Sequence, residues 1–173
     1  GDFRGLNQRT VADSYPADSM DSVYDCVRRS DMTTKMDGVE GYFAIPIAKE
    51  DRPKTAIRLP VTPNTFGLFQ LCVALFGLKN AGAAFDRWMN SIVAKFNQPT
   101  VVSLRDDIFL TTVRRTGETD RELLQRHLGE VREFWNLLRK EGARLKPAKL
   151  RLAVPASEPL EVLGYVVQNH KLT

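Results

Sequence analysis

Two adjacent aspartates between short apolar runs are the feature that most constrains how this sequence can fold. Asp106 and Asp107 follow the apolar residues 101–104 and precede the apolar residues 108–110. Apolar runs on both sides of a short polar segment predict a β-hairpin with the aspartates at its tip. An ordinary hairpin turn explains the pair as well, because Asp is a common turn residue. A carboxylate in such apolar surroundings otherwise needs a cation, hydrogen bonds or a metal ion to offset its desolvation.

A third aspartate, Asp37, shifts the balance between these interpretations. It lies between Met36 and Gly38 and interrupts a segment over residues 34–48, which we predict to be a strand that breaks at Asp37-Gly38 and resumes over residues 42–47. If residues 34–37 pair beside the predicted hairpin, three carboxylates converge at one end of a sheet. Carboxylates and substrate phosphates are common ligands of Mg²⁺. Two such ions can stabilise the attacking and the leaving oxygen of a phosphoryl transfer.

The remaining segments predict an α+β fold. Helical periodicity marks residues 18–28, 81–97 and 119–141. Asn80 is placed to cap the second of these helices. Further strands are expected over residues 54–60, 66–73 and 158–168. This order fits an antiparallel sheet with helices packed on one face, in a single domain over residues 1–173.

Charge and composition limit the classes of partner. The chain has 173 residues and a formal net charge of +4, a small basic excess that gives weak support to a polyanionic partner. Its apolar runs are too short to span a bilayer, so we expect no membrane partner. The N-terminal residues 1–10 lack the charged-then-apolar layout of a signal peptide. We therefore expect an intracellular protein that is not secreted.

Six segments, in order along the chain, resemble the motifs of reverse transcriptases of the gypsy-type retrotransposon and retroviral family. They are DFRGLNQRT (2–10), SDMTTKMDGVEGYFAIPIAKEDRPKTAIR (30–58), FGLKNAGAAFDRWMN (76–90), VVSLRDDIFL (101–110), LLRKEGARLKPAKLRL (137–152) and LEVLGYVV (160–167). In that family these are a fingers motif, motif A with its following strand, motif B, the YxDD hairpin, motif D and motif E. Each segment is a weak signal alone, but six in register are specific. They indicate a fold similar to the reverse-transcriptase palm with partial fingers.

The resemblance implies roles for the acidic residues. Asp37 and Asp106 would bridge two Mg²⁺ ions, and Asp107 would be the third acid of the triad. A backbone oxygen at Gly38 or Val39 would contact one metal.

It also implies a nucleotide pocket and a nucleic-acid surface. Tyr42 would be a gate that clashes with a 2′-hydroxyl and so favours deoxynucleotides, although a core aromatic would explain it as well. The rest of the pocket would be Phe76, Gly77 and a motif D lysine, Lys146 or Lys149, for which a solvated surface charge is an equal explanation. Contacts to nucleic acid would come from Arg4, Arg9, Leu104 and Gly164.

Four departures from the family pattern accompany the resemblance. Leu104 and Arg105 occupy the first two positions of the YxDD hairpin, where the family carries an aromatic residue and then a variable one. Gly82 and Leu75 replace two prolines of motif B. The basic fingers strand that precedes DFRGLN in the family is expected to be absent. We also expect no thumb, connection or RNase H domain after motif E.

Three functions remain open at this point. The first is an RNA-directed DNA polymerase core, which adds deoxynucleoside triphosphates to a DNA primer on an RNA template by two-metal transfer. The second is a catalytically inactive, reverse-transcriptase-derived structural subunit of a ribonucleoprotein such as a mitochondrial ribosome, with RNA and protein subunits as partners and a mitochondrial location. The third is a protein-interaction scaffold without nucleic acid, which the small net charge allows.

Overall fold

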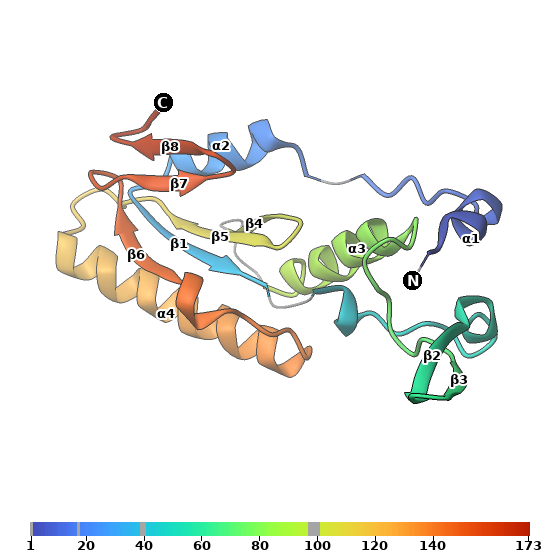
Figure 1. Cartoon of the computed structure of the whole chain (residues 1–173). Helices are drawn as coiled ribbons and strands as arrows, with labels where there is room; N and C mark the ends of the chain where they lie inside the picture. The colour runs from blue at the N-terminus through green and yellow to red at the C-terminus, as the bar shows by residue number, and fades with distance from the viewer. Residues whose placement is uncertain (1, 17, 39–40, 97–100) are drawn as a thin grey trace.

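A four-stranded antiparallel sheet forms the centre of the molecule (Figure 1). The computed structural model describes residues 2–16, 18–38, 41–96 and 101–173. The sheet has the strand order β4-β5-β1-β6. Its strands are β1 (Met32–Asp37), β4 (Val101–Leu104), β5 (Asp107–Thr112) and β6 (Arg151–Pro155). The condition set for the three carboxylates to converge is met, because β1 runs along β5 from Met32 opposite Thr112 to Asp37 opposite Asp107.

Two helices cover one face of this sheet. They are α3 (Ala81–Val93) and α4 (Asp120–Lys140). Their apolar stripes pack with the side chains that β1 and β5 direct to this face, in a core of Met36, Phe85, Met89, Ile92, Phe96, Val101, Ile108, Leu110, Val131, Phe134 and Leu138. A capping box starts α4, since the Thr119 side chain accepts a hydrogen bond from the Glu122 backbone and Glu122 returns one. The helix predicted over residues 119–141 is therefore confirmed.

The opposite face is covered by a helix and a small second sheet. The helix is α2 (Met20–Arg28), and the sheet consists of β7 (Leu160–Val162), β8 (Tyr165–Gln168) and β9 (Lys171–Leu172). Side chains alternate between faces along a strand, so Phe109 points to this side while Ile108 and Leu110 point to the other. The central sheet is thus buried on both faces, and residues of the β4–β5 hairpin pack into the core on each side.

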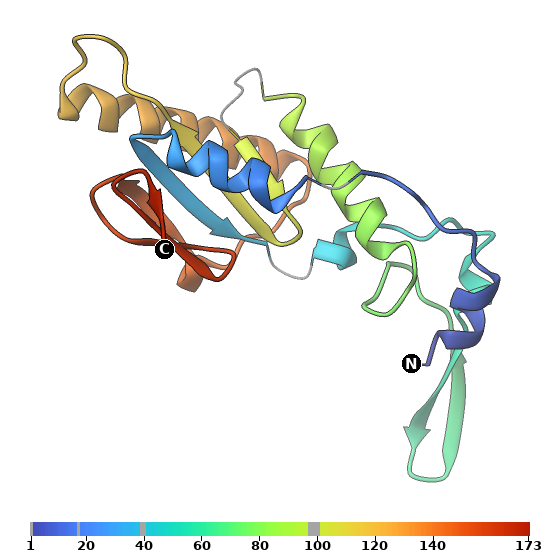
Figure 2. The same cartoon turned by 90° about the horizontal axis from the view of Figure 1, so that it is seen from above.

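The remaining elements extend away from the sheet (Figure 2). They are α1 (Arg4–Arg9), the short 3₁₀ turn η2 (Arg52–Thr55), and the hairpin β2 (Ile57–Thr62) with β3 (Thr65–Phe69). The 3₁₀ turn η1 (Gly41–Ala44) lies close to the sheet, because Tyr42 packs against the core that α3 and α4 cover. A third 3₁₀ turn, η3 (Pro147–Lys149), precedes β6. The β2–β3 hairpin exposes five large apolar side chains: Leu59, Val61, Phe66, Leu68 and Phe69. No helix among the described residues is long and apolar enough to cross a membrane.

Two local predictions are wrong. Residues 42–47 do not resume a strand; instead Ile45 donates its N–H to the Tyr42 carbonyl and closes a 3₁₀ turn. Pro46 has no N–H to give to a ladder, so its pairing with Val73 remains an isolated bridge. Asn80 precedes α3 but makes no side-chain cap. Its side chain accepts from the Asp13 backbone and donates to the Val11 carbonyl, which ties the segment after α1 to α3.

Candidate active site

The end of β1 and the turn of the β4–β5 hairpin bring the predicted aspartates together. Asp37 is the last residue of β1 and lies opposite Asp107, the first residue of β5. The next residue, Gly38, donates its N–H to the backbone carbonyl of Asp106 at 2.8 Å. A Cβ on Gly38 would lie 3.5 Å from that same carbonyl oxygen, so the two backbones are already close. Three acidic residues therefore meet at one end of the sheet.

A tight two-residue turn presents Asp106. Leu104 pairs with Asp107, which leaves Arg105 and Asp106 as the central residues of the turn. Arg105 has a φ of 55°, in the left-handed region that disfavours side chains with a Cβ. The position normally suits glycine, so this turn stores strain at the site.

Replacing Arg105 by Gly should raise the free energy of unfolding by about 1 kcal/mol, because Gly adopts positive φ without a clash. Arg105→Ala removes the same side chain but keeps the Cβ, and it should give no such gain. Urea denaturation of the three proteins measures the difference. Equal stabilities of the Gly and Ala variants would contradict the strain.

Asp37 is enclosed and carries two lysine partners. Its relative exposure is 8%. Lys146 Nζ lies 2.7 Å from Oδ1, and Lys149 Nζ lies 2.9 Å from Oδ2. Burial acts to raise the pKa of Asp37, but the contacts with Lys146 and Lys149 outweigh it and lower the pKa overall. The carboxyl group is therefore ionised at neutral pH.

The other two aspartates have different surroundings. Asp106 is partly buried, and burial raises its pKa; Lys146 opposes this effect, while the negative charges of Asp37 and Asp107 add to it. Asp107 lies 3.5 Å from the Nζ of Lys35, which belongs to β1. Lys35 also donates to the Glu161 carbonyl and so links β1 to β7. Negative charge is thus concentrated at Asp37 and Asp106, with lysines around it.

The donor set is compatible with a divalent cation, although the side chains do not form a finished cage. Among the described residues, no three His, Cys, Asp or Glu side chains are grouped closely enough to hold a metal ion. Asp37 Oδ1, however, is buried, and its partner is the ammonium group of Lys146. An oxygen that already attracts a cation and has a spare lone pair is the type of ligand that Mg²⁺ takes.

An aromatic cluster lies beside the aspartates. The Tyr42 ring meets Phe76 edge-on, with 4.7 Å between ring centroids, and meets Phe85 at 5.9 Å. Phe76 remains 61% exposed, so one side of the cluster is open to solvent. Gly77 has a φ of 94°, which a side chain would strain. Gly82 leaves room beneath the phenol, because a Cβ there would lie 3.9 Å from the Tyr42 hydroxyl.

Comparison with known proteins agrees with this arrangement. Residues 1–167 match the family model described as "Reverse transcriptase (RNA-dependent DNA polymerase)". The chain belongs to the reverse transcriptase family. This reverse transcriptase-like domain is 33% identical over 112 residues to an "RNA-directed DNA polymerase homolog" of Oenothera berteroana, a match that covers 65% of the chain and 75% of the homolog. It is 26% identical over 168 residues to the "Retrovirus-related Pol polyprotein from transposon gypsy" of Drosophila melanogaster, covering 97% of the chain and 15% of the polyprotein.

Solved structures show the same fold. The "foamy viral protease-reverse transcriptase dRH in complex with ds DNA" matches 99% of the domain with a TM-score of 0.80 at 18% identity. The "foamy viral protease-reverse transcriptase in complex with RNA/DNA hybrid" matches 97% of it with a TM-score of 0.74, also at 18% identity. The domain spans 27% and 20% of those two chains, and so corresponds to a small part of each. The predicted α+β palm fold is confirmed.

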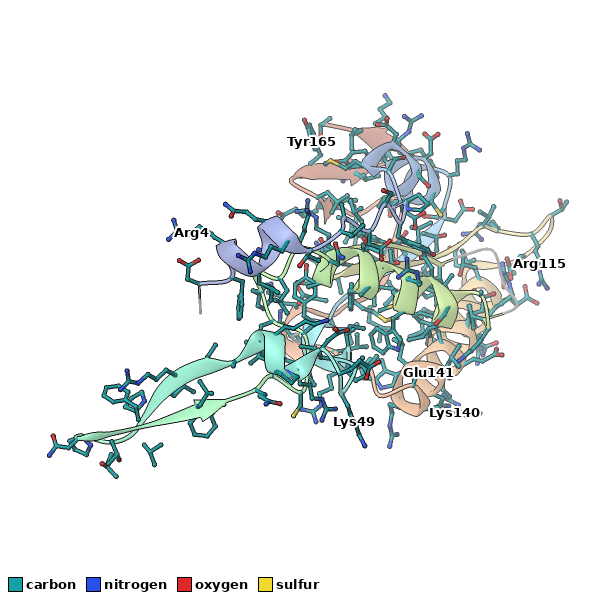
Figure 3. The ribbon with its side chains drawn as sticks, turned by 90° about the vertical axis from the view of Figure 1, so that its right-hand side faces the viewer. Arg4, Lys49, Arg115, Lys140, Glu141 and Tyr165 are labelled. Atoms are coloured by element: carbon teal, nitrogen blue, oxygen red, sulfur yellow. The ribbon has the colours of Figure 1, made fainter. Side chains whose placement is uncertain are left out.

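The other predicted site residues of the reverse transcriptase-like domain are placed as follows. Leu104 packs against the cluster that includes β7 and β8, and Gly164 forms the β7–β8 turn with a φ of 90°. Both therefore lie on the side of the sheet that α2 covers. Arg4 and Arg9 belong to α1, which lies beyond α3 from the β4–β5 hairpin (Figures 1 and 2). The structure does not bring them to the aspartates, and Figure 3 shows Arg4 at the outer side of α1. Val39 lies outside the described residues.

Two contacts around the candidate site were missed by sequence reasoning. Lys35 was not singled out, although its place two residues before Asp37 puts it on the same strand face, near Asp107. Asn7 was not identified as a candidate either. It donates to the Gly77 carbonyl at 2.7 Å and accepts from the Lys79 N–H at 2.9 Å. Asn7 thus ties α1 to the loop that carries Phe76 and Gly77. The only sequence signal was its position inside the DFRGLNQRT motif.

Proposed function

We propose that this domain is the nucleotidyl-transfer core of an RNA-directed DNA polymerase. One observation carries the proposal: Asp37 and Asp106, 69 positions apart in sequence, meet at one end of the sheet through the Gly38–Asp106 backbone hydrogen bond. Phosphoryl transfer asks a protein mainly for positioning and for charge that holds divalent cations. A rigid sheet end with clustered carboxylates supplies both.

Two Mg²⁺ ions would be held by Asp37 and Asp106, with Asp107 as the third acid of the site. Bound there, they would supply the positive charge that stabilises the attacking and leaving oxygens of the transfer. Asp37 is ionised because its lysine contacts lower its pKa, so it can offer a carboxylate. A backbone oxygen at Gly38 or Val39 would be a further ligand of one of the two ions.

The incoming deoxynucleoside triphosphate would lie against Tyr42 and Phe76. The open side of Phe76 offers an apolar surface to a sugar or base, and the Tyr42 ring behind it limits the space for a 2′-hydroxyl. Gly77 lets the backbone approach closely, and Lys146 is near enough to the aspartates to reach a phosphate.

An RNA template and a DNA primer would be the nucleic-acid partners. Support comes from the foamy virus relatives, one bound to double-stranded DNA and one to an RNA/DNA hybrid. Leu104 and Gly164 would lie beside the primer end, and Arg4 and Arg9 would contact the template through their charge. Phosphate contacts of this kind weaken as salt rises.

Single-nucleotide addition tests the proposal, because one addition does not require a processive grip on the duplex. The domain is mixed in excess with a labelled DNA primer on an RNA template, one deoxynucleotide and Mg²⁺. We expect extension by one nucleotide that EDTA abolishes. Extension that persists in EDTA, or none with either Mg²⁺ or Mn²⁺, would argue against this function.

Replacing Tyr42 by Val should raise the use of ribonucleotides relative to deoxynucleotides by about 10- to 200-fold, the usual range for a pocket that gains space. The reason is that Val lacks the ring that packs against Phe76. Tyr42→Phe keeps the ring and should keep the selectivity. The ratio of kcat/KM for the two nucleotides measures the effect, and a Val variant as selective as the wild type would remove Tyr42 from the gate.

A structural role in a ribonucleoprotein is the second candidate. The exposed apolar side chains of the β2–β3 hairpin favour it, because an isolated two-stranded hairpin is marginal in water unless another surface covers it. In this case the basic residues of the domain would bind RNA by charge and shape. RNA binding that Asp106→Asn leaves unchanged, together with no nucleotide addition by the wild type, would favour this role over polymerase activity.

A further inference from the structure

We propose that Lys146 and Lys149 are counter-ions of Asp37 that compete with divalent cations for its carboxylate. The inference rests on the proposed function, because it concerns cations at the same acidic residue. It assigns to Lys149 in particular a task that differs from contact with nucleotide phosphates. The two lysines set how tightly the site binds metal and how stable the domain is without it.

The carboxylate of Asp37 is in contact with both lysines. Each carboxylate oxygen has its own ammonium group, with Lys146 at 2.7 Å from Oδ1 and Lys149 at 2.9 Å from Oδ2. Mg²⁺ binds carboxylate oxygens at roughly 2.0–2.1 Å and demands near-octahedral geometry. An ammonium group in contact with the same oxygen occupies space that the ion and its water ligands need. At least one lysine must therefore move before a cation can bind Asp37 directly.

Backbone hydrogen bonds hold both lysines close to Asp37. Lys146 donates its backbone N–H to the Asp37 carbonyl at 2.9 Å, beside the bridge between Gly38 and Leu145. Lys149 donates its backbone N–H to the Lys146 carbonyl at 3.1 Å and so closes η3. Both lysine side chains thus start from backbone that is attached to the end of β1. Their contact with Asp37 is not the chance meeting of two long surface side chains.

The two lysines differ in how far their side chains are buried. A carboxylate as enclosed as Asp37 is costly to leave without a partner. The Lys149 side chain is 62% exposed, whereas that of Lys146 is 37% exposed. Moving the Lys149 ammonium group into solvent when a cation binds therefore costs less free energy than moving that of Lys146. Asp37 would keep a positive partner throughout, first lysine and then metal.

Mn²⁺ titration followed by electron paramagnetic resonance tests the competition, with thermal unfolding in EDTA as a second measurement. Three proteins are compared: wild type, Lys149→Gln and Arg144→Gln. Arg144 is a matched control, because it is an exposed cation of the same loop and no hydrogen bond or ion pair among the described residues joins it to Asp37. We expect Lys149→Gln to bind Mn²⁺ about two- to fivefold more tightly than Arg144→Gln does, the factor for losing one partly exposed ion pair. It should also unfold at a lower temperature in EDTA.

The outcomes separate this inference from the proposed function. Equal Mn²⁺ affinities of Lys149→Gln and Arg144→Gln, with the wild type binding Mn²⁺ through Asp37, would overturn the competition and leave the function intact. Binding by Lys149→Gln but not by the wild type would support the competition. Absence of Mn²⁺ binding in all three proteins would overturn both.

Discussion

Asp106→Asn should reduce the rate of single-nucleotide addition by about 10³-fold or more, comparable to the loss of a central electrostatic group in other active sites. Asn has nearly the same shape as Asp and can preserve the turn, in which the Asp106 backbone carbonyl accepts from Gly38. What it removes is the negative charge that would hold a divalent cation. The loss should therefore be in the rate, with the fold intact.

Asp86 offers a matched control for this variant. It is a partly buried acid on α3, and burial raises its pKa as it does for Asp106. It does not lie at the strand ends where Asp37, Asp106 and Asp107 meet. Asp86→Asn should keep the addition rate within a few-fold of the wild type. Equal rates of Asp106→Asn and wild type, with both folded by circular dichroism, would remove Asp106 from the chemistry.

The second large effect is a loss of stability in mild acid, which arises from His127. This residue is fully buried under the sheet on α4. Its Nε2 lies 2.7 Å from the Thr34 hydroxyl, and its Nδ1 lies 2.8 Å from the Thr112 hydroxyl. Thr112 also donates to Glu130, which pairs with Arg126. Burial, with the positive charge of Arg126 as a smaller cause, lowers the pKa of His127 to about 4.

The direction of the pH effect follows from this shift. The ordinary pKa of His is 6.5. Between pH 6.5 and pH 4, His127 is therefore protonated in the unfolded chain but mostly neutral in the folded chain. The contribution of neutral His127 to the free energy of unfolding is fully present above pH 6.5 and is lost as the pH falls from 6.5 to 4. The loss amounts to about 3 kcal/mol at 1.36 kcal/mol per pKa unit. Carboxylates with lowered pKa, such as Glu118 at about 2, lose their contribution only at lower pH.

Urea denaturation between pH 7 and pH 4.5 measures this dependence. His127→Gln keeps a hydrogen-bonding side chain but removes the ring that titrates. Its stability should be lower at pH 7 and nearly independent of pH over this interval. If His127→Gln loses stability with falling pH as steeply as the wild type does, another group is responsible.

Local patterns predicted the elements that carry the acids. The β4–β5 hairpin could be read from two apolar runs around Asp106 and Asp107, and α4 from its helical period. The pairing of β1 with β5 was raised as a condition for the aspartates to meet, because a carboxylate in apolar surroundings needs compensation, and the structure shows it. These are features in which local preference and tertiary structure agree.

Contacts between distant segments were beyond such reasoning. The strand expected over residues 42–47 does not form, because the backbone there makes hydrogen bonds within the segment and with residues 72–74. The Lys149–Asp37 contact joins residues 112 positions apart, and nothing local distinguishes Lys149 from a surface lysine. The buried hydrogen bonds of His127 depend on how α4 lies across β1 and β5. Each of these features is fixed by packing of distant parts of the chain.

Anomalous diffraction from crystals of the domain soaked in MnCl₂ shows whether the acidic residues at the end of the sheet hold a divalent cation. We expect anomalous density between the carboxylates of Asp37 and Asp106, with Lys149 moved away from Asp37. Crystals of Asp37→Asn under the same conditions should lack it. A wild-type crystal saturated with Mn²⁺ that shows no such density there, with both lysines still in contact with Asp37, would show that these carboxylates do not hold a divalent cation.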